Sequence, residues 1–156
     1  MNRAGWGGVG LVVVLVVLHF VLRVGLGYQQ LVPDLLVVAV LLAARRLSAG
    51  VAAGVGFLLG LLEGALVPAA LAASALSLTI VAFMGARSRE VFSEDNYVLL
   101  ALYLFVGKWA YDVILFIATG DLFGARASYL FLISPITALY AAASGIVAVT
   151  IYRALT

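Results

Sequence analysis

Ionisable side chains inside apolar segments are the first candidates for chemistry in this sequence. Glu63, Lys108 and Asp112 each lie within such a segment, whereas His19 and Asp34 lie nearer to segment ends. Lys108 and Asp112 are four residues apart, so on a helix they share a face and can form an ion pair. Because an isolated charge in an apolar environment is costly, each of these residues marks a functional or structural site.

The other residue types exclude most catalytic and metal chemistry. The chain has no cysteine and a single histidine, His19, which excludes thiolate zinc sites, iron–sulfur clusters and multi-histidine metal sites. Serines are plentiful, but one histidine gives no basis for a Ser-His-Asp arrangement, and no Gly-x-Ser-x-Gly, His-Glu-x-x-His or phosphate-binding glycine loop occurs. We therefore expect no catalytic, metal-binding or cofactor-binding residues.

The composition shows which kind of element positions these side chains. The chain has 156 residues, 66% of them hydrophobic and only 10% charged, and its mean hydropathy is +1.24. Soluble domains are about 45–50% apolar and about 25% charged. The composition therefore predicts one polytopic transmembrane domain over residues 1–156. The sequence pI of about 9.2 rests on nine basic against seven acidic residues, an excess that suits membrane topology and does not indicate nucleic-acid binding.

Six apolar blocks predict an all-α integral membrane protein with a six-helix transmembrane bundle, since a spanning helix needs roughly 20 residues. The stretch from Gly50 to Ala86 would be about 55 Å long as one helix, so we expect a hairpin that turns near Pro68. Pro135 is expected to kink the last helix. The predicted spans are about 7–22, 31–44, 50–67, 69–86, 97–118 and 128–152.

The distribution of arginines predicts the orientation of these spans. With six spans and both termini in the cytoplasm, the inside collects most of the arginines, namely Arg3, Arg45, Arg46, Arg87, Arg89 and Arg153. Only Arg23 and Arg126 remain outside, and Arg23 and Asp34 are the polar residues expected at the outer boundary. If the second block does not span, five spans with an outside N-terminus give the same balance.

The depth of three charged residues along their helices predicts a polar network. If the third span leaves the cytoplasm near Gly50 and the fifth near Tyr97, then Glu63, Lys108 and Asp112 reach similar depths, from the midplane to the outer half of the membrane. They can form one network that locks helices together. The alternatives are a site for a partner or ligand, or a path for protons or ions.

Small residues recur at helix-contact spacing in the third span. Gly56, Gly60 and Gly64 follow one another at intervals of four and so lie along one helix face. Such a ridge lets two helix backbones approach closely, which in lipid takes the place of the missing hydrophobic driving force. We interpret it as a packing face within the chain, with the docking of a partner helix as the alternative.

An ordered set of motifs lies between Leu31 and Ala86. Pro33-Asp34 opens a short apolar segment, Arg45-Arg46 follow it, and Gly-Val-Gly-Phe-Leu-Leu-Gly-Leu-Leu-Glu then runs from Gly54 to Glu63. This order resembles the rod shape-determining protein MreD family, and the chain length and the six apolar blocks also fit. The chain departs from the family where it carries Glu63 in place of the usual aspartate. It also has Val67-Pro68-Ala69 where the family tends to have a glycine.

The resemblance implies a non-enzymatic scaffold of the elongasome, the machinery for cell elongation, cell shape and peptidoglycan synthesis. It implies a multi-pass protein of the bacterial cytoplasmic (inner) membrane with cytoplasmic termini. The implied partners are the bitopic membrane protein MreC and, through it, RodA, a class B penicillin-binding protein and MreB. The implied fold is like the substrate-binding S components of energy-coupling-factor transporters.

That likeness of fold supplies the main alternative function, which is an S component of a vitamin or micronutrient transporter. S components place ligand contacts in their outer loops. The outer loops predicted here are short and carry few aromatic residues, among them Tyr28 and Phe123, which argues against a vitamin site.

Overall fold

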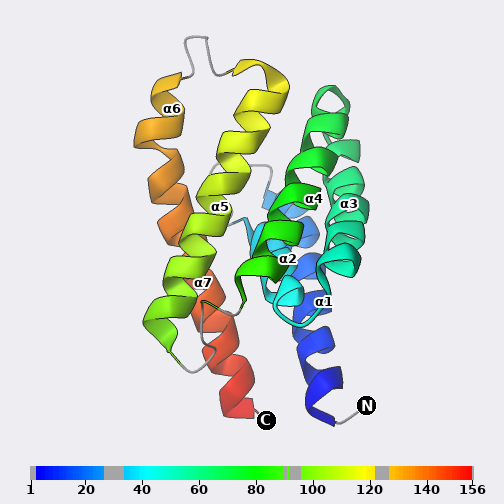
Figure 1. The fold of residues 1–156 in the computed structure, drawn as a ribbon, viewed down its shortest axis with the longest axis vertical. Helices are drawn as coiled ribbons and strands as arrows, with labels where there is room; N and C mark the ends of the chain where they lie inside the picture. The colour runs from blue at the N-terminus through cyan, green and yellow to red at the C-terminus, as the bar shows by residue number, and fades with distance from the viewer. Residues whose placement is uncertain (1–2, 27–33, 90, 92–95, 122–126, 156) are drawn as a thin grey trace.

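The computed structural model describes residues 3–26, 34–89, 91, 96–121 and 127–155, which form a bundle of helices (Figure 1). The elements in chain order are α1 (Arg3–Leu26), α2 (Leu35–Ala44), α3 (Ala49–Ala65), the 3₁₀ turn η1 (Pro68–Ala70), α4 (Leu71–Ser88), α5 (Tyr97–Thr119), α6 (Ala127–Leu132) and α7 (Ser134–Leu155). The described residues contain no β-strand, so the predicted all-α fold class is confirmed. Tyr28, Pro33, Phe123 and Arg126 lie outside the described residues.

Four helical stretches are long and apolar enough to cross a membrane: Gly7–Gly25 in α1, Pro68–Ser88, Tyr97–Thr119 and Ser134–Leu155. They identify a helical membrane protein. Two further apolar helices are shorter, because α2 has 10 residues and α3 has 17. At 1.5 Å per residue α2 measures only about 15 Å, roughly half the thickness of the hydrocarbon core. In the described part of the chain, the second predicted span (31–44) is therefore a half-length helix that begins at Leu35.

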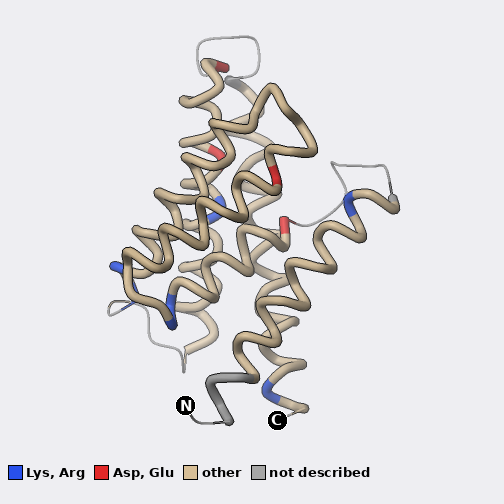
Figure 2. The backbone as a smooth tube through the Cα atoms, turned by 90° about the vertical axis from the view of Figure 1, so that its right-hand side faces the viewer, with Lys and Arg blue, Asp and Glu red and all other residues tan. Residues whose placement is uncertain are grey.

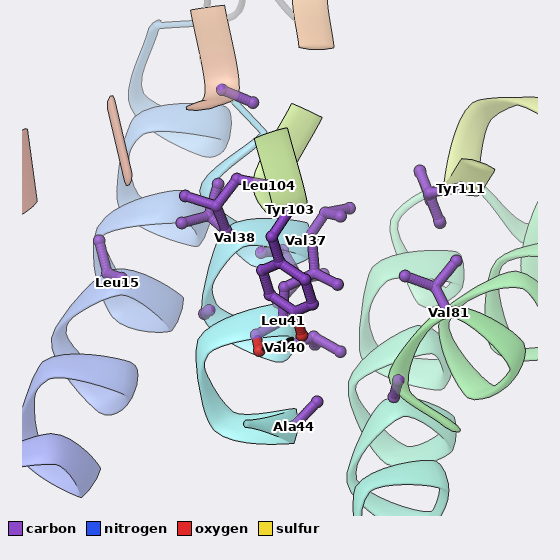
Figure 3. Packing of buried hydrophobic residues seen from close by; sticks show 14 of the residues in the cluster. Leu15, Val37, Val38, Val40, Leu41, Ala44, Val81, Tyr103, Leu104 and Tyr111 are labelled. Carbon is purple, nitrogen blue, oxygen red and sulfur yellow. Dashed lines mark hydrogen bonds between the residues drawn. The ribbon is translucent and has the colours of Figure 1, made fainter. Parts of the chain in front are cut away.

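The short helix α2 forms the centre of the bundle. Nine of its ten residues are buried, and it contacts α1, α3, α4, α5 and α7. Its sequence is apolar on every side, as is typical of a helix that other helices surround. Figure 3 shows its side chains packed among those of its neighbours: Val37, Val38, Val40 and Leu41 with Leu15, Val81, Tyr103 and Leu104.

The helices α3 and α4 form a hairpin at the predicted place. α3 ends at Ala65, the 3₁₀ turn begins at Pro68, and α4 returns along α3 from Leu71. Proline suits the first position of such a turn because its missing N–H would have no partner there. Hydrogen bonds from the backbone N–H of Leu66 to the Glu63 carbonyl (3.2 Å) and of Val67 to the Gly64 carbonyl (3.0 Å) close the turn.

The helices α5 and α7 pack side by side on the other side of the bundle (Figure 1). The side chain of Asn96 accepts two backbone hydrogen bonds, 2.9 and 3.4 Å long, at the start of α5, and Gly120 ends this helix with a φ of 77°. The helical stretch that contains Pro135 is interrupted at Ile133, between α6 and α7. Proline lacks a backbone donor, and its ring clashes with the preceding turn, so the break precedes Pro135.

The two ends of the described chain lie at the same end of the bundle (Figures 1 and 2). The first turns of α1 touch the last turn of α7, since a Cβ on Gly7 would overlap the Tyr152 hydroxyl. The arginines that follow α2, close α4 and close α7 are Arg45, Arg46, Arg87, Arg89 and Arg153. Figure 2 shows the acidic residues of the described part away from this end.

Candidate functional site

A buried group of polar side chains joins α1 to α3. His19 and Arg23 are four residues apart on α1 and face Glu63 in the last turns of α3. Nε2 of His19 lies 3.2 Å from Oε2 of Glu63, and the Arg23 guanidinium forms an ion pair with Oε1 of the same carboxylate. His19 and Glu63 are buried, whereas the Arg23 side chain is 20% exposed. We call these three residues the α1–α3 charge group.

A second group joins α2, α5 and α7. Lys108 on α5 forms an ion pair with Asp112 one turn later, and its Nζ lies 3.2 Å from Oδ2 of Asp34 at the start of α2. The hydroxyl of Ser134, the first residue of α7, donates a 2.6 Å hydrogen bond to Oδ2 of Asp112. The Lys108 ammonium also lies 5.1 Å from the centre of the Tyr111 ring. Asp34, Lys108, Asp112 and Ser134 are called the α5 charge group below.

The charges of the two groups nearly balance. His19 lies close enough to interact electrostatically with Asp34 and Lys108 of the α5 charge group as well as with Arg23. Together the groups contain two permanent cations and three carboxyl groups, so they are neutral only when one further proton is bound by His19 or by a carboxyl group. Buried ion pairs stabilise a fold only when their charges and hydrogen bonds are matched. The arrangement is therefore suited to holding five helices at fixed positions.

The predicted network of Glu63, Lys108 and Asp112 is thus divided between two groups. Lys108 and Asp112 are in contact, but Glu63 contacts His19 and Arg23 of α1 instead. Arg23 and Asp34, expected as polar residues at the outer boundary, each supply a partner to one group and keep part of their side chains exposed, 20% and 24%.

The spacing of His19 and Arg23 is a sequence feature that could have predicted their shared contact with Glu63. His19 and Arg23 have the four-residue spacing of one helix face, the same spacing that indicated the pair of Lys108 and Asp112. Nothing in the sequence placed Ser134 beside Asp112, because that contact depends on how α7 packs against α5.

The glycine ridge of α3 packs against α4 of the same chain. A Cβ on Gly56 would lie 2.8 Å from the Ala82 Cβ, and one on Gly60 would lie 2.5 Å from the Ala75 Cα. A Cβ on Gly64 would overlap the Cα of Leu71. The backbones of the two helices therefore meet over almost their whole length. Gly50 and Gly54, on the same helix, have open space at the Cβ position.

The chemistry available to the described side chains is limited by these partners. His19 is paired with Glu63 and Ser134 with Asp112, so the described part of the chain places no serine, histidine and carboxylate in one relay. Nor does it contain three His, Cys, Asp or Glu side chains grouped to hold a metal ion.

Comparisons of the chain with protein-family models, with curated proteins and with solved structures returned no match.

Proposed function

We propose that the chain is a non-enzymatic membrane scaffold of the bacterial cell-elongation machinery, which binds MreC and links it to the cell-wall synthases RodA and a class B penicillin-binding protein, and to MreB. The observation that carries this proposal is the internal pairing of the intramembrane charges. Glu63, Lys108 and Asp34 each have an oppositely charged partner on another helix. Because these charges are paired with other side chains of the same chain, the pairing supports a structural role for them.

The motif that resembles the MreD family fits this role. Both of its acidic residues, Asp34 and Glu63, belong to the charge groups. Two of its three glycines, Gly56 and Gly60, make the contact of α3 with α4, whereas Gly54 has open space beside it. Four residues of the motif, both acids and two glycines, thus make contacts between helices, which supports the proposal of an MreD-like fold related to the S components.

We also propose six spans with both termini in the cytoplasm. Two observations support this topology. The start of α1 and the end of α7 lie at the same end of the bundle, as an even number of crossings requires, and the arginines at the C-terminal ends of α2, α4 and α7 gather there. In this proposal α2 makes the second crossing although it has only 10 residues, because its neighbours shield it from lipid.

Reporter fusions test the topology directly. A reporter active only outside the cytoplasm is expected to be silent when fused to Met1 and when fused to Thr156. A fusion between Thr119 and Ser128 is the matched control and is expected to be active. Activity at Met1 with silence at Thr156 would favour five spans and contradict the proposal.

Partner identity tests the function. A scaffold needs exposed apolar surface for partner helices, and α7 offers Ile136 and Leu139, which are 67% and 65% exposed. A photoreactive residue at either position, in cells with the native neighbours intact, is expected to capture MreC. The same residue at Leu104, which is fully buried, serves as the control and is expected to capture nothing.

Two outcomes would overturn the scaffold proposal. Capture and co-purification of paired ATPases with a coupling subunit would identify an S component of a transporter, the alternative function. Co-purification of neither set from membranes in which MreC is present would also contradict it.

A further inference from the structure

The end of the bundle that holds the termini contains a basic pocket. It has a volume of about 120 Å³, lies between α1, α2, α5 and α7, and is lined by Arg45, Arg46, Tyr152 and Arg153. Arg45 is buried over the Tyr103 ring, with 5.3 Å between guanidinium carbon and ring centre. Three cationic side chains on one small pocket point to an anion as its ligand.

Arg46 lines both this pocket and the apolar groove next to it. Its guanidinium lies against Gly8 of α1, where a Cβ would overlap it. Within the described part of the chain Arg46 makes no hydrogen bond and no ion pair. Asp34, which precedes α2, lies at the opposite end of that helix from Arg46.

An apolar groove continues from Arg46 along α1. Its first part has a volume of about 250 Å³ and is lined by Gly8, Arg46, Leu47 and valines of α1 and α3. Its second part, about 270 Å³, shares Val12, Val13 and Val55 with the first and continues between α1 and α3. The basic pocket and the apolar groove are therefore continuous, with the arginines at one end.

The length of the groove matches one membrane leaflet. Its lining on α1 extends from Gly8 to Val17, a span of nine helical steps or about 14 Å. This is close to half of the roughly 30 Å hydrocarbon core. Two residues beyond Val17 the groove meets the contact of His19 with Glu63, which joins α1 to α3.

We propose that this pocket and groove bind one anionic phospholipid, with its phosphate at Arg46 where the basic pocket meets the groove, and an acyl chain between α1 and α3. Basic pockets between transmembrane helices near the membrane surface suit such headgroups. A partner helix would fill the apolar groove without contacting the basic pocket, and a free anion would bind the basic pocket without contacting the groove. The inference requires only that the chain lies in a membrane and is independent of the proposed function.

Native mass spectrometry of the delipidated, full-length protein tests the proposal. Phosphatidylglycerol is expected to bind more tightly than phosphatidylcholine with the same acyl chains. Arg46→Gln should weaken binding of phosphatidylglycerol about fivefold, the effect of one basic residue near a membrane surface. Arg46→Lys should retain most of the binding. The control Arg87→Gln removes an arginine from the same end outside the pocket and should leave binding unchanged.

A second pair of variants tests the groove. Val13→Phe combined with Val55→Phe fills it and should weaken binding of phosphatidylglycerol. Val14→Phe combined with Val51→Phe is the matched control, since both valines are exposed outside the groove, and should bind as the wild type does.

Any of five results would overturn the proposal. Equal binding of the two lipids, or an equal loss with Arg87→Gln, would show that the pocket does not recognise the charge. Binding of inorganic phosphate as tight as that of phosphatidylglycerol, or normal binding with a filled groove, would identify a free-anion site. A photoreactive residue at Val13 that captures a partner helix and no lipid would assign the groove to a protein.

Discussion

The helix α3 has two interfaces that are built in different ways. Towards α4 it presents Gly56, Gly60 and Gly64, and the two backbones touch without intervening side chains. Towards α1 its described polar contact is made by Glu63 with His19 and Arg23, and below that contact an apolar groove separates the helices. The first interface is defined by volume over several turns. The second is defined by charge at one level, and it tolerates a gap.

The difference has a physical basis in the membrane. Lipid tails are as apolar as the side chains, so helices associate through close packing or through polar contacts. Close packing leaves no room for an added atom, whereas a polar contact is sensitive to the balance of charge. The two interfaces should therefore fail in response to different substitutions.

The largest effect is expected from Gly60→Leu. Its side chain would be forced into the backbone of α4 at Ser74 and Ala75 and would separate the hairpin, so we expect no stable folded protein. Gly54→Leu makes the same change at a position with open space and should leave the thermal stability in detergent unaltered. Equal stability of the two variants, measured by fluorescence-detected gel filtration, would mean that the α3–α4 contact does not depend on volume.

The α5 charge group allows a test of contacts that depend on charge. Lys108→Met leaves Asp34 and Asp112 close together without their cation, which should lower the free energy of unfolding by about 3 kcal/mol. The triple variant with Lys108→Met, Asp34→Asn and Asp112→Asn removes the uncompensated charges and should be more stable than the single variant. Denaturant titrations measure both, and a triple variant that is no more stable than Lys108→Met would contradict a charge-balanced group.

The same experiment shows whether the two charge groups are separate. Glu63 forms no ion pair with Lys108 or Asp112, and His19 is the residue that links it to their group, so Glu63→Gln and Lys108→Met should be only weakly coupled in their effects on stability. Lys108→Met and Asp112→Asn should be strongly non-additive, because those residues form an ion pair. If the coupling free energy between Glu63 and Lys108 is as large as that between Asp112 and Lys108, the three residues form the single network that the sequence predicts.

Features that depend on spacing within one segment could be predicted from the sequence. The intervals of four among Gly56, Gly60 and Gly64 gave the packing face, and the interval from Lys108 to Asp112 gave their ion pair. Pro68 gave the position of the hairpin turn. Each of these follows from the period of a helix or from proline chemistry alone.

Contacts between segments could not be predicted in the same way. The depth of Glu63 could be counted along α3, but the sequence does not say which helix faces it, and the neighbour is α1 rather than α5. The sequence predicts Asp34 at the membrane boundary because it predicts that the second block spans the membrane. In the structure α2 has only 10 residues and is surrounded by other helices, so Asp34, which precedes its first turn, reaches Lys108 inside the bundle.

A smaller effect is expected where the α1–α3 charge group loses its carboxylate. Glu63→Gln leaves Arg23 without its anion, but the Arg23 side chain is already 20% exposed near the end of α1 and can extend towards the membrane surface. We expect a loss of about 1–2 kcal/mol, less than for the buried Lys108. Val98→Gln, at a residue of α5 that is 74% exposed, controls for the added amide. A loss of stability with Glu63→Gln as large as that with Lys108→Met would show that the Arg23 side chain does not extend towards the membrane surface.

The smallest effect should come from a neutral contact that depends on neither close backbones nor charge. The Tyr103 hydroxyl donates a 2.9 Å hydrogen bond to the carbonyl of Leu41, in the last turn of α2, and thereby ties the central helix to α5. Tyr103→Phe keeps the buried ring and removes the donor, which should cost about 1 kcal/mol, or about 2–4 °C in Tm. The Leu41 carbonyl still accepts the backbone N–H of Arg45 at 3.3 Å, so it is not left without a partner and the loss stays small. Tyr140→Phe makes the same change on a side chain that is 52% exposed and should not alter Tm. A Tyr103→Phe loss as large as that of Lys108→Met would mean that α2 is held chiefly by this one hydrogen bond, and that neither volume nor charge is what fixes the centre of the bundle.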